Sequence, residues 1–386
     1  MAPRTRVALI GLSSSAKTAW ASNAHLPYLL SARGRSKFTL TALLNSSIPA
    51  AERAIAAYDL PASEIRAYGD PAALAADPDV DLVVCNTRVD THFDTVLPSV
   101  KAGKDVYVEW PLAQDAQHAR VLAEEVRKAG GRGVVGLQGG VAPLARKVRE
   151  LLDQGRIGKV LSSEVRAFGG VNDRANIPEK LDYFLDRKIG GNVYMIGFGH
   201  VFHLLQSVLG ELASVKGDFH LQRPNVGVMD AATNSSIVRT VRSNVPDLVL
   251  VSGRWDQSSI TQQNAPLHYR FRRGQPFPGE PALEWTINGE KGEIRVISLK
   301  NMFISVGDTS PITIEVHDFE TDKVDKVEWD WEDWQQELPI PARNISTLYE
   351  AFAEAKEKGT KPDYVTFDEA VRRHEQLEGL LAGWEA

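Results

Sequence analysis

The chain has 386 residues, of which 43% are hydrophobic and 24% charged, so it is long enough for two domains with separate apolar cores. Its formal net charge of −6 and pI near 5.9 offer no basic field for a phosphate backbone, which argues against direct nucleic-acid binding. The single cysteine, Cys85, excludes a disulfide within the chain and fits a reducing compartment.

Residues 5–135 alternate short apolar runs with amphipathic, alanine-rich segments such as 121–129. Strands separated by helices are typical of a parallel, doubly wound sheet that is buried on both faces. Cys85 lies inside one of these runs, where we expect it to pack as a small hydrophobe. The expected strands are Val7–Leu12, Leu40–Leu44, Leu82–Cys85, Asp105–Val108 and Gly133–Leu137.

The pattern changes after about residue 140. A helix marked by Leu144, Val148, Leu151 and Leu152 is followed by consecutive strand-like runs with short turns, which predict an open, mostly antiparallel sheet. These runs are Val160–Val165, Ser235–Val241, Leu248–Arg254, Leu267–Phe271, Leu283–Ile287, Gly292–Ile297 and Ile312–Val316. We therefore divide the chain into domains 1–137 and 138–386.

Two further segments of the second half carry a pattern. Thr366-Phe-Asp-Glu369 is a capping box, which predicts the start of the last helix. Residues 328–334 alternate acids with tryptophans, so they form either an edge strand with one aromatic face or a partner-binding patch. We favour the strand, because alternation at period two is what a half-buried strand requires.

The N-terminus passes directly into the first apolar run, and the chain contains no apolar run of 18 residues. We expect a cytoplasmic protein that does not enter a membrane.

The turn after the first strand indicates a dinucleotide site. Gly11 is the one glycine of a Gly-x-Gly-x-x-Gly pattern that remains, and the small residues Ser13 and Ala16 replace the other two. Small residues still let the backbone approach a pyrophosphate, and the hydroxyls of Ser14 and Ser15 add hydrogen-bond donors. The alternative is an ordinary strand-to-helix turn with a serine cap. We expect the segment Gly11, Leu12, Ser13, Ser14, Ser15 and Ala16 to bind the cofactor.

The second strand ends in Asn45-Ser46, which offers no carboxylate to a ribose 2′-hydroxyl. A carboxylate at this place would repel a 2′-phosphate, so its absence leaves NADP at least tolerated. No arginine lies beside Asn45 in the sequence to bind a 2′-phosphate and so select NADP. The cofactor is therefore expected to be NADP or NAD.

Three motifs in a fixed order carry a family resemblance. They are Asp81-Leu-Val-Val-Cys-Asn86-Thr87-Arg88-Val-Asp-Thr-His92, Ala102-Gly103-Lys104-Asp105-Val106-Tyr107 and Val108-Glu109-Trp110-Pro111. This arrangement resembles the glucose–fructose oxidoreductase / inositol dehydrogenase / rhizopine-catabolism (Gfo/Idh/MocA) family, and in particular a fungal subgroup that includes the yeast galactose-regulon repressor. The resemblance implies a Rossmann-type nucleotide domain followed by an α+β domain with a large open sheet. It also implies a cofactor cleft lined by Asn86, Thr87, Arg88, His92, Glu109, Trp110, Pro111 and Gln138.

The same resemblance shows which catalytic groups this chain lacks. The family carries a catalytic lysine where Trp110 stands, and an aspartate one helical turn before a histidine where this chain has Ile196 and His200. Two of the three acid/base groups are therefore replaced by apolar side chains. We expect His200 to be the remaining catalytic group, with Tyr194 as a second candidate, against the alternative that either side chain only packs in the core.

Other polar residues near this helix are weaker candidates: His203, Tyr183, Asp186 and Arg187. His203 lies three residues after His200, but no third ligand has a recognisable spacing, so no metal is expected.

Three functions remain open from the sequence. The leading one is an NAD(P)-dependent oxidoreductase acting on a small organic carbonyl, imine or alcohol such as a secondary metabolite. The second is a non-catalytic dinucleotide-binding regulator with a protein partner, and the third is a non-redox isomerase or cyclase that retains its cofactor. The resemblance also implies a homodimer through the open sheet.

Overall fold

The computed structural model describes residues 3–15, 18–169, 173–233, 235–304 and 312–386. Its internal contacts define two compact units. Unit 1 comprises Met1–Gln138, Lys188–Gly191 and Glu332–Gln376, and unit 2 comprises Gly139–Arg187, Asn192–Trp331 and Leu377–Ala386. The division differs from the expected one, because the chain returns to unit 1 after residue 331.

The sheet of unit 1 has the strand order β3-β2-β1-β4-β5-β6, and every neighbouring pair is parallel. This is the doubly wound order in which the strand sequence reverses beside β1, and the expected nucleotide-binding fold is confirmed. The strands are β1 Thr5–Ile10, β2 Phe38–Leu44, β3 Arg66–Tyr68, β4 Leu82–Cys85, β5 Asp105–Val108 and β6 Gly133–Val135. The sequence pattern missed β3, whose three residues are too few to show a period.

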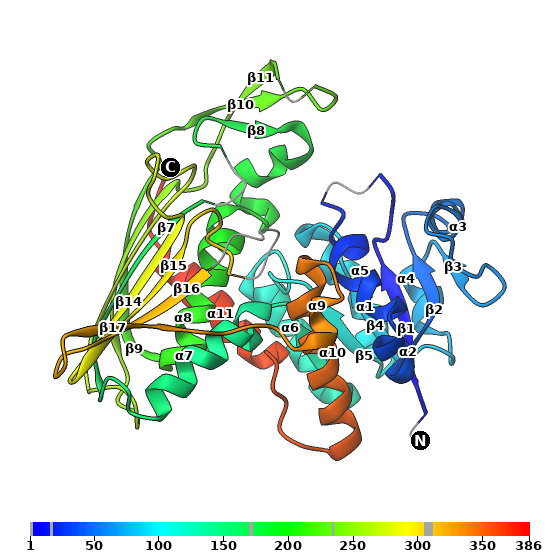
Figure 1. Cartoon of the computed structure of the whole chain (residues 1–386). Coiled ribbons are helices and arrows are strands. Elements are labelled where there is room, and N and C mark those ends of the chain that lie inside the picture. The colour runs from blue at the N-terminus through cyan, green and yellow to red at the C-terminus, as the bar shows by residue number, and fades with distance from the viewer. Residues whose placement is uncertain (1–2, 16–17, 170–172, 234, 305–311) are drawn as a thin grey trace. The chain divides into compact units, whose positions relative to one another are not determined.

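Helices alternate with these strands, as Figure 1 shows. They are η1 Ala21–His25, α1 Leu26–Leu30, α2 Ala32–Lys37, α3 Ile48–Ala57, α4 Pro71–Ala75, α5 Val89–Lys101 and α6 Ala116–Ala129. Asp115 caps α6 by accepting the backbone N–H of His118 (2.8 Å), and Gly130 ends the helix at φ +77°.

Two later helices, α9 Asp333–Gln336 and α10 Ile340–Lys358, complete unit 1, together with α11 Phe367–Leu380 as far as Gln376. Tyr349 of α10 stacks on Tyr28 (ring centroids 5.2 Å apart) and meets Phe38 edge-on (5.3 Å). All three rings are fully buried. This aromatic contact explains why the segment after residue 331 packs with the first 138 residues.

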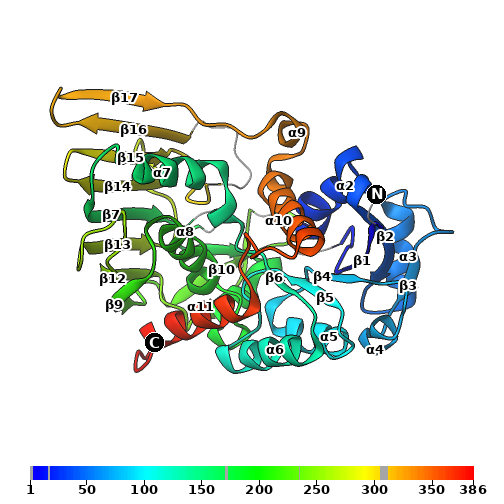
Figure 2. The same ribbon diagram turned by 90° about the horizontal axis from the view of Figure 1, so that it is seen from below.

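Unit 2 is built on an eight-stranded sheet of order β17-β16-β15-β14-β7-β13-β12-β9, which Figure 2 shows in sequence. Only the pair β7–β13 is parallel, so the expected open, mostly antiparallel sheet is confirmed. The strands are β7 Val160–Phe168, β9 Leu212–His220, β12 Leu248–Trp255, β13 Pro266–Arg272, β14 Leu283–Gly289, β15 Gly292–Ser298, β16 Ile312–Asp318 and β17 Lys323–Val327.

One face of this sheet carries the core of unit 2. The helices against it are α7 Pro143–Asp153, η5 Val193–Phe198 and α8 Gly199–Leu209. Phe198 of η5 stacks on Tyr269 of β13 with ring centroids 4.7 Å apart. Because side chains alternate along a strand, the residues between the buried ones face outward.

A smaller sheet of order β11-β10-β8 completes unit 2, with short helical turns beside it. Its strands are β8 Asn176–Pro178, β10 Asn225–Met229 and β11 Ile237–Arg242, and the turns are η2 Gln138–Val141, η3 Glu179–Leu185 and η4 Arg187–Ile189. η2 begins at the last residue of unit 1.

The expected strand over residues 328–334 is wrong. Residues 328–332 form neither strand nor helix, and Asp333 begins α9. Glu332 and Gln335 form a reciprocal capping box there, and Trp329 donates its indole N–H to the carbonyl of Ile312 (2.8 Å). Local capping therefore outweighed the alternating pattern.

In the part of the chain that the structure describes, no helix has the length and apolar character that crossing a bilayer requires.

Candidate functional site

The turn after β1 places Gly11 where only glycine fits well. Its φ is +88°, and a Cβ on it would lie 3.0 Å from the carbonyl oxygen of Asn86 and 3.2 Å from a methyl carbon of Thr87. Gly11 also donates its N–H to Leu44 (3.1 Å), while Asn86 donates its N–H to Ile10 (3.1 Å). The turns that follow β1 and β4 therefore lie in contact at the carboxyl edge of the sheet, where open α/β sheets bind ligands.

The residues after Gly11 divide into buried and exposed positions. Leu12 is fully buried, so its side chain supports the loop from below. Ser14 and Ser15 are exposed, and the hydroxyls of Ser13 and Ser15 lie 3.0 Å apart. Ala16 falls outside the described residues. The first helical segment begins only at Ala21, later than the expected start directly after the serines.

Asn45 and Ser46 follow β2. The Asn45 amide donates to the carbonyls of Leu12 (2.9 Å) and Ala50 (3.3 Å), so this side chain ties the first loop to α3. Ser46 is exposed beside it. A charge that acts on a ribose or 2′-phosphate is therefore better introduced at position 46 than at position 45, where it would face two carbonyl oxygens.

We expect Ser46→Asp to shift dinucleotide preference toward NADH, because the carboxylate would accept from a ribose hydroxyl and repel a 2′-phosphate. The ratio of NADPH to NADH affinity should fall at least about tenfold, equivalent to about 1.4 kcal/mol. Calorimetric titration of both cofactors measures this ratio, and Ser46→Asn is the uncharged control. An unchanged ratio in Ser46→Asp would show that this loop does not meet the ribose.

Asn86, the residue directly after β4, has a side chain without hydrogen-bond partners in the described part of the chain. Its Nδ2 and Oδ1 atoms are both buried, yet neither has a hydrogen-bond partner among the described residues. Leaving such a group unsatisfied costs about 1–3 kcal/mol, so a buried amide of this kind calls for a ligand or a water. Its place beside Gly11 makes a bound ligand the simplest account.

The neighbours of Asn86 are engaged within the protein. The Thr87 hydroxyl accepts from that of Thr91 (2.9 Å), and the exposed Arg88 pairs with Asp90 (2.6 Å). Cys85 is fully buried, and burial raises the pKa of its thiol to about 11, so it packs as a hydrophobe as expected.

His92 lies between the turns that follow β4 and β5. Its Nε2 is 3.0 Å from the carbonyl of Thr87 and its Nδ1 is 3.0 Å from the carbonyl of Pro111, and only 1% of the residue is exposed. Burial lowers the pKa of His92. A neutral imidazole has one N–H for these two carbonyls, so His92 positions the two turns relative to each other.

Glu109 is the outer member of a buried polar chain that the sequence did not indicate. Its Oε1 lies 2.9 Å from Nε2 of His25, and Nδ1 of His25 lies 2.9 Å from the Tyr349 hydroxyl. The His25 side chain is fully buried, whereas that of Glu109 is 13% exposed. A carboxylate accepts and a tyrosine hydroxyl can donate, so both contacts are satisfied together when His25 donates at Nε2 and accepts at Nδ1.

The surroundings of this polar chain keep the Tyr349 hydroxyl protonated. Burial, followed by the charge of Glu109, raises the pKa of Tyr349 well above its usual value, so the hydroxyl stays protonated. On the other side, a Cβ at Gly136 would lie 2.5 Å from Glu109 Oε2, so only glycine leaves room for the carboxylate. Glu109 is thereby fixed at the carboxyl edge of β5 and β6.

We expect His25→Ala to lower the free energy of unfolding by about 2–4 kcal/mol, because it removes the hydrogen-bond partner of both the Glu109 carboxylate and the Tyr349 hydroxyl. Tyr349→Phe removes only one hydrogen bond and should cost about 1 kcal/mol. Urea denaturation measures both. The partly exposed His118, paired with Asp115, is the control, and His118→Ala should change stability by less than about 1 kcal/mol. Equal losses for His25→Ala and His118→Ala would contradict the polar chain.

Trp110 and Gln138 are both nearly buried. Trp110 is 4% exposed, and its ring lies 4.7 Å from that of His374 of α11 at an angle of 50°. The family lysine position is thus filled by an aromatic ring packed on a helix of the same unit. Gln138 is 6% exposed, and its buried Oε1 has no hydrogen-bond partner among the described residues.

The helix of unit 2 that carries the catalytic candidates begins at a cap. Asn192 Oδ1 accepts the backbone N–H groups of Tyr194 and Met195, each at 3.0 Å. Over residues 191–200 the only positions that are not buried are Ile196 and His200, four residues apart on one helical face. The His200 ring meets that of Phe303 edge-on at 5.9 Å. His200 and Ile196 are therefore the two side chains of this stretch that a ligand can reach.

Tyr194 belongs to the core instead. It is 1% exposed, its ring stacks on Phe198 at 5.2 Å, and its hydroxyl donates to the carbonyl of Leu377 (2.8 Å). This placement matches the core-packing alternative for Tyr194 and gives no support to a catalytic role. His203, 8% exposed, packs near Gly140.

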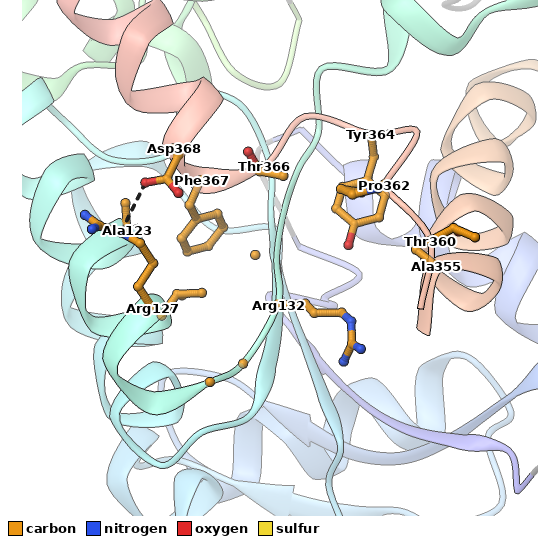
Figure 3. Close-up of a pocket in the computed structure, with 14 residues that line it drawn as sticks. Ala123, Arg127, Arg132, Ala355, Thr360, Pro362, Tyr364, Thr366, Phe367 and Asp368 are labelled. Carbon is orange, nitrogen blue, oxygen red and sulfur yellow. Dashed lines mark ion pairs between the residues drawn. The ribbon is translucent and has the colours of Figure 1, made fainter. Parts of the chain in front are cut away.

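A pocket of about 290 Å³ lies elsewhere in unit 1, between α6, α11 and the start of β6 (Figure 3). Arg127 and Asp368 form an ion pair at its rim (3.4 Å), and Phe367 and Tyr364 line its wall. Its place before Gly133, the first residue of β6, puts it at the amino edge of the parallel sheet. Ligands of such sheets bind at the carboxyl edge, so this pocket is not the candidate site.

The parallel sheet, the glycine turn and the second, mostly antiparallel domain define a two-domain fold with a Rossmann-type dinucleotide-binding half. Residues 5–137 match the family described as oxidoreductase family, NAD-binding Rossmann fold, and residues 143–298 match the Gal80p C-terminal domain. The first match assigns residues 5–137 to a Gfo/Idh/MocA-type NAD-binding Rossmann domain, and the second assigns residues 143–298 to a domain of the Gal80p C-terminal type.

Two curated relatives differ in what they do. The dehydrogenase aclE of Aspergillus oryzae is 26% identical over 387 residues, covering 100% of this chain and 98% of the relative. The galactose/lactose metabolism regulatory protein GAL80 of Saccharomyces cerevisiae is 26% identical over 302 residues, covering 75% of this chain and 66% of the relative. The enzyme aclE and the regulator GAL80 thus have the same sequence identity to this chain over their matched residues.

Solved structures agree on the fold. A super-repressor mutant of Gal80p from Saccharomyces cerevisiae superimposes with a TM-score of 0.85 at 21% identity, over 98% of this chain and 96% of that one. An oxidoreductase from Agrobacterium radiobacter in complex with NAD+, L-tartaric acid and magnesium gives 0.73 at 14% identity, over 99% and 97%. These likenesses establish the fold alone.

The residues of this chain fit a nicotinamide dinucleotide. The glycine turn leaves the backbone open to a pyrophosphate, and the orphaned amide of Asn86 offers a donor and an acceptor at the same edge of the sheet. The match of residues 5–137 to an NAD-binding Rossmann domain supports NAD(P) as the cofactor class. In the described part of the chain, no group of three His, Cys, Asp or Glu side chains is arranged to hold a metal ion.

Proposed function

We propose that the chain is a cytoplasmic NAD(P)-dependent oxidoreductase that acts on a small organic carbonyl, imine or alcohol. The Asn86 amide beside Gly11 carries this proposal, because it is a buried polar group at the ligand-binding edge of the sheet for which the described residues supply no hydrogen-bond partner. Similarity to the dehydrogenase aclE over nearly the full length of both chains supports an enzyme. The Gfo/Idh/MocA resemblance also supports a homodimer.

The division of labour follows from the residues present. When bound, NAD(P) supplies the hydride donor or acceptor. Gly11, Ser14 and Asn86 hold the dinucleotide in unit 1. In unit 2, the partly exposed imidazole of His200 exchanges a proton with the substrate oxygen or nitrogen.

Trp110 and Ile196 stand in place of acid/base groups, and this restricts the substrates that suit the proposed site. General acid/base assistance contributes about 10²–10⁴-fold, so one imidazole without the lysine and aspartate serves best a substrate that needs little proton abstraction. A conjugated carbonyl or an imine meets that condition better than a sugar alcohol. The two apolar side chains also favour an apolar substrate.

A dinucleotide-binding regulator is the second candidate. It is favoured by the loss of the lysine and aspartate at positions 110 and 196, and by the 26% identity to GAL80. As a regulator the protein would bind a dinucleotide and a protein partner without turnover.

Purified protein with NADH or NADPH and a panel of carbonyls and imines tests the proposal. We expect loss of nicotinamide absorbance with at least one panel member. Tight dinucleotide binding with no oxidation of either cofactor, together with a partner protein retained from native extract, would replace the enzyme by the regulator.

A further inference from the structure

An arginine-rich surface lies on the outward face of the large sheet, where β7 and β13 end. Arg270 and Arg272 occupy alternate positions of β13, and because Tyr269 and Phe271 point into the core, both arginines face outward. Their guanidinium carbons lie 5.5 and 5.1 Å from the ring centroid of Phe168, the last residue of β7. We call Arg174, Arg223, Arg270 and Arg272 the arginine patch.

The charge of the arginine patch is not balanced by acids. Across the described residues, no carboxylate lies within 4.0 Å of any of its four guanidinium groups. Two other outward arginines of the same sheet are paired: Arg166, the cross-strand neighbour of Arg270, contacts Glu280 (2.9 Å), and Arg295 contacts Glu315 (2.6 Å). The arginine patch therefore gathers four cations that have no carboxylate partner among the described residues, on a chain whose net charge is −6.

Two acids near the patch, Asp173 and Asp247, are already engaged; Asp173 accepts from the Gln275 amide (3.0 Å) and from the backbone N–H groups of Ala175 and Asn176. The carboxylate of Asp247 accepts the backbone N–H groups of Gln222 (2.7 Å) and Arg223 (2.8 Å). Burial, followed by the charges of Arg270, Arg174 and Arg223, lowers the pKa of Arg272, with Asp247 acting in the opposite sense. Arginine nevertheless stays protonated in proteins, so this repulsion is present in the folded chain.

Arg272 also has a hydrogen-bond donor, its Nε–H, that is not used within the described residues. One of its terminal nitrogens donates to the carbonyl of Gln275 (2.7 Å), but its Nε is buried and has no hydrogen-bond partner among the described residues. A buried, charged donor without an acceptor is rare in native structures. The position of this donor, next to three further cations, is the second observation that points to an anion.

We propose that the arginine patch binds a doubly charged oxyanion of the phosphate class, either free phosphate or the phosphate group of a small metabolite. Guanidinium forks match the tetrahedral oxygens of phosphate in pairs, and a double negative charge offsets more of the repulsion than a single carboxylate does. All of the residues involved belong to unit 2. The dinucleotide turn consists of residues of unit 1, so the two sites share no residue, and the inference does not rest on the proposed redox function.

Titration of the full chain with inorganic phosphate tests this site. The variant is Arg270→Gln/Arg272→Gln, and the matched control is Arg295→Gln, an outward arginine of the same sheet that is neutralised by Glu315. Calorimetry should show phosphate affinity at least about tenfold weaker in the double variant than in wild type or the control, as expected when two charge-assisted forks are lost. A cooperative thermal unfolding transition, measured alongside, reports that the variant is folded.

Thermal melting gives an independent readout. In chloride buffer the double variant should melt no lower than wild type, because substitution removes the repulsion. In phosphate at equal ionic strength, wild type should gain stability and the variant should not. A residue of purely structural importance would instead lower the melting temperature in both buffers. Glycerol 3-phosphate as a second titrant separates a phosphate ester from free phosphate.

Three outcomes would overturn the proposal. Equal phosphate affinity in wild type and the double variant would place the anion elsewhere. Equal stabilisation by chloride at the same ionic strength would reduce the effect to screening. Phosphate binding that disappears as a dimer forms at higher protein concentration would assign the arginine patch to a second copy of the chain. Should the double variant not fold, the single variant Arg223→Gln tests the same expectation.

Discussion

Gly11→Leu is expected to abolish dinucleotide binding, with affinity for both NADH and NADPH reduced at least about 100-fold, equivalent to about 2.7 kcal/mol. A side chain at Gly11 would press on the carbonyl of Asn86 at 3.0 Å and displace the turn whose backbone approaches the pyrophosphate. The loss should be large because the substitution moves the backbone itself, whereas a change at Ser46 alters only one side-chain contact. Calorimetric titration measures the loss directly.

Gly130→Leu is the matched control for this experiment. Gly130 has a similar φ of +77°, but open space surrounds the position of its Cβ, and it lies at the C-terminus of α6 away from the turn. Both variants carry the strain of a side chain at positive φ, about 1–2 kcal/mol, so a difference between them reports the cofactor site. Unchanged cofactor affinity in Gly11→Leu would show that the dinucleotide does not bind at this edge of the sheet.

His200→Ala is expected to lower kcat/KM on the true substrate by about 10²–10⁴-fold, equivalent to about 2.7–5.5 kcal/mol of transition-state stabilisation. Dinucleotide affinity should stay nearly unchanged, because the residues proposed to hold the phosphates lie in the turns of unit 1. The imidazole is the one titratable side chain along residues 191–200 that is not buried. Steady-state kinetics combined with cofactor titration measures both quantities.

Tyr194→Phe separates the two catalytic candidates of this helix. The hydroxyl it removes donates to the carbonyl of Leu377 in the core, so the variant should lose about 1 kcal/mol of stability and keep its turnover. A large loss of turnover in Tyr194→Phe with His200→Ala fully active would reverse the assignment. If neither wild type nor any variant transfers hydride although the cofactor binds, the regulator is the better description.

The sequence predicted the fold well, because hydrophobic periodicity is a local property. The predicted strands at Leu82–Cys85 and Asp105–Val108 coincide with β4 and β5. The Thr366–Glu369 capping box is also present, with the Thr366 N–H donating to the Glu369 carboxylate at 2.9 Å. The strand predicted over residues 328–334 failed because alternation in a short polar stretch does not distinguish a strand from a capped turn.

The sequence by itself determined the motif positions of the candidate site: the glycine turn at Gly11, the asparagine at 86, and the apolar replacements at 110 and 196. Tertiary structure decided what these side chains contact. It brought His25 to Glu109 across 84 positions and to Tyr349 across 324, committed the Asn45 amide to two carbonyls, and buried Tyr194 against Leu377. It also gathered the arginine patch from separate segments of the chain. The physical reason is that periodicity and turn chemistry act between near neighbours, whereas hydrogen bonds, burial and charge depend on distances that only the packed chain sets.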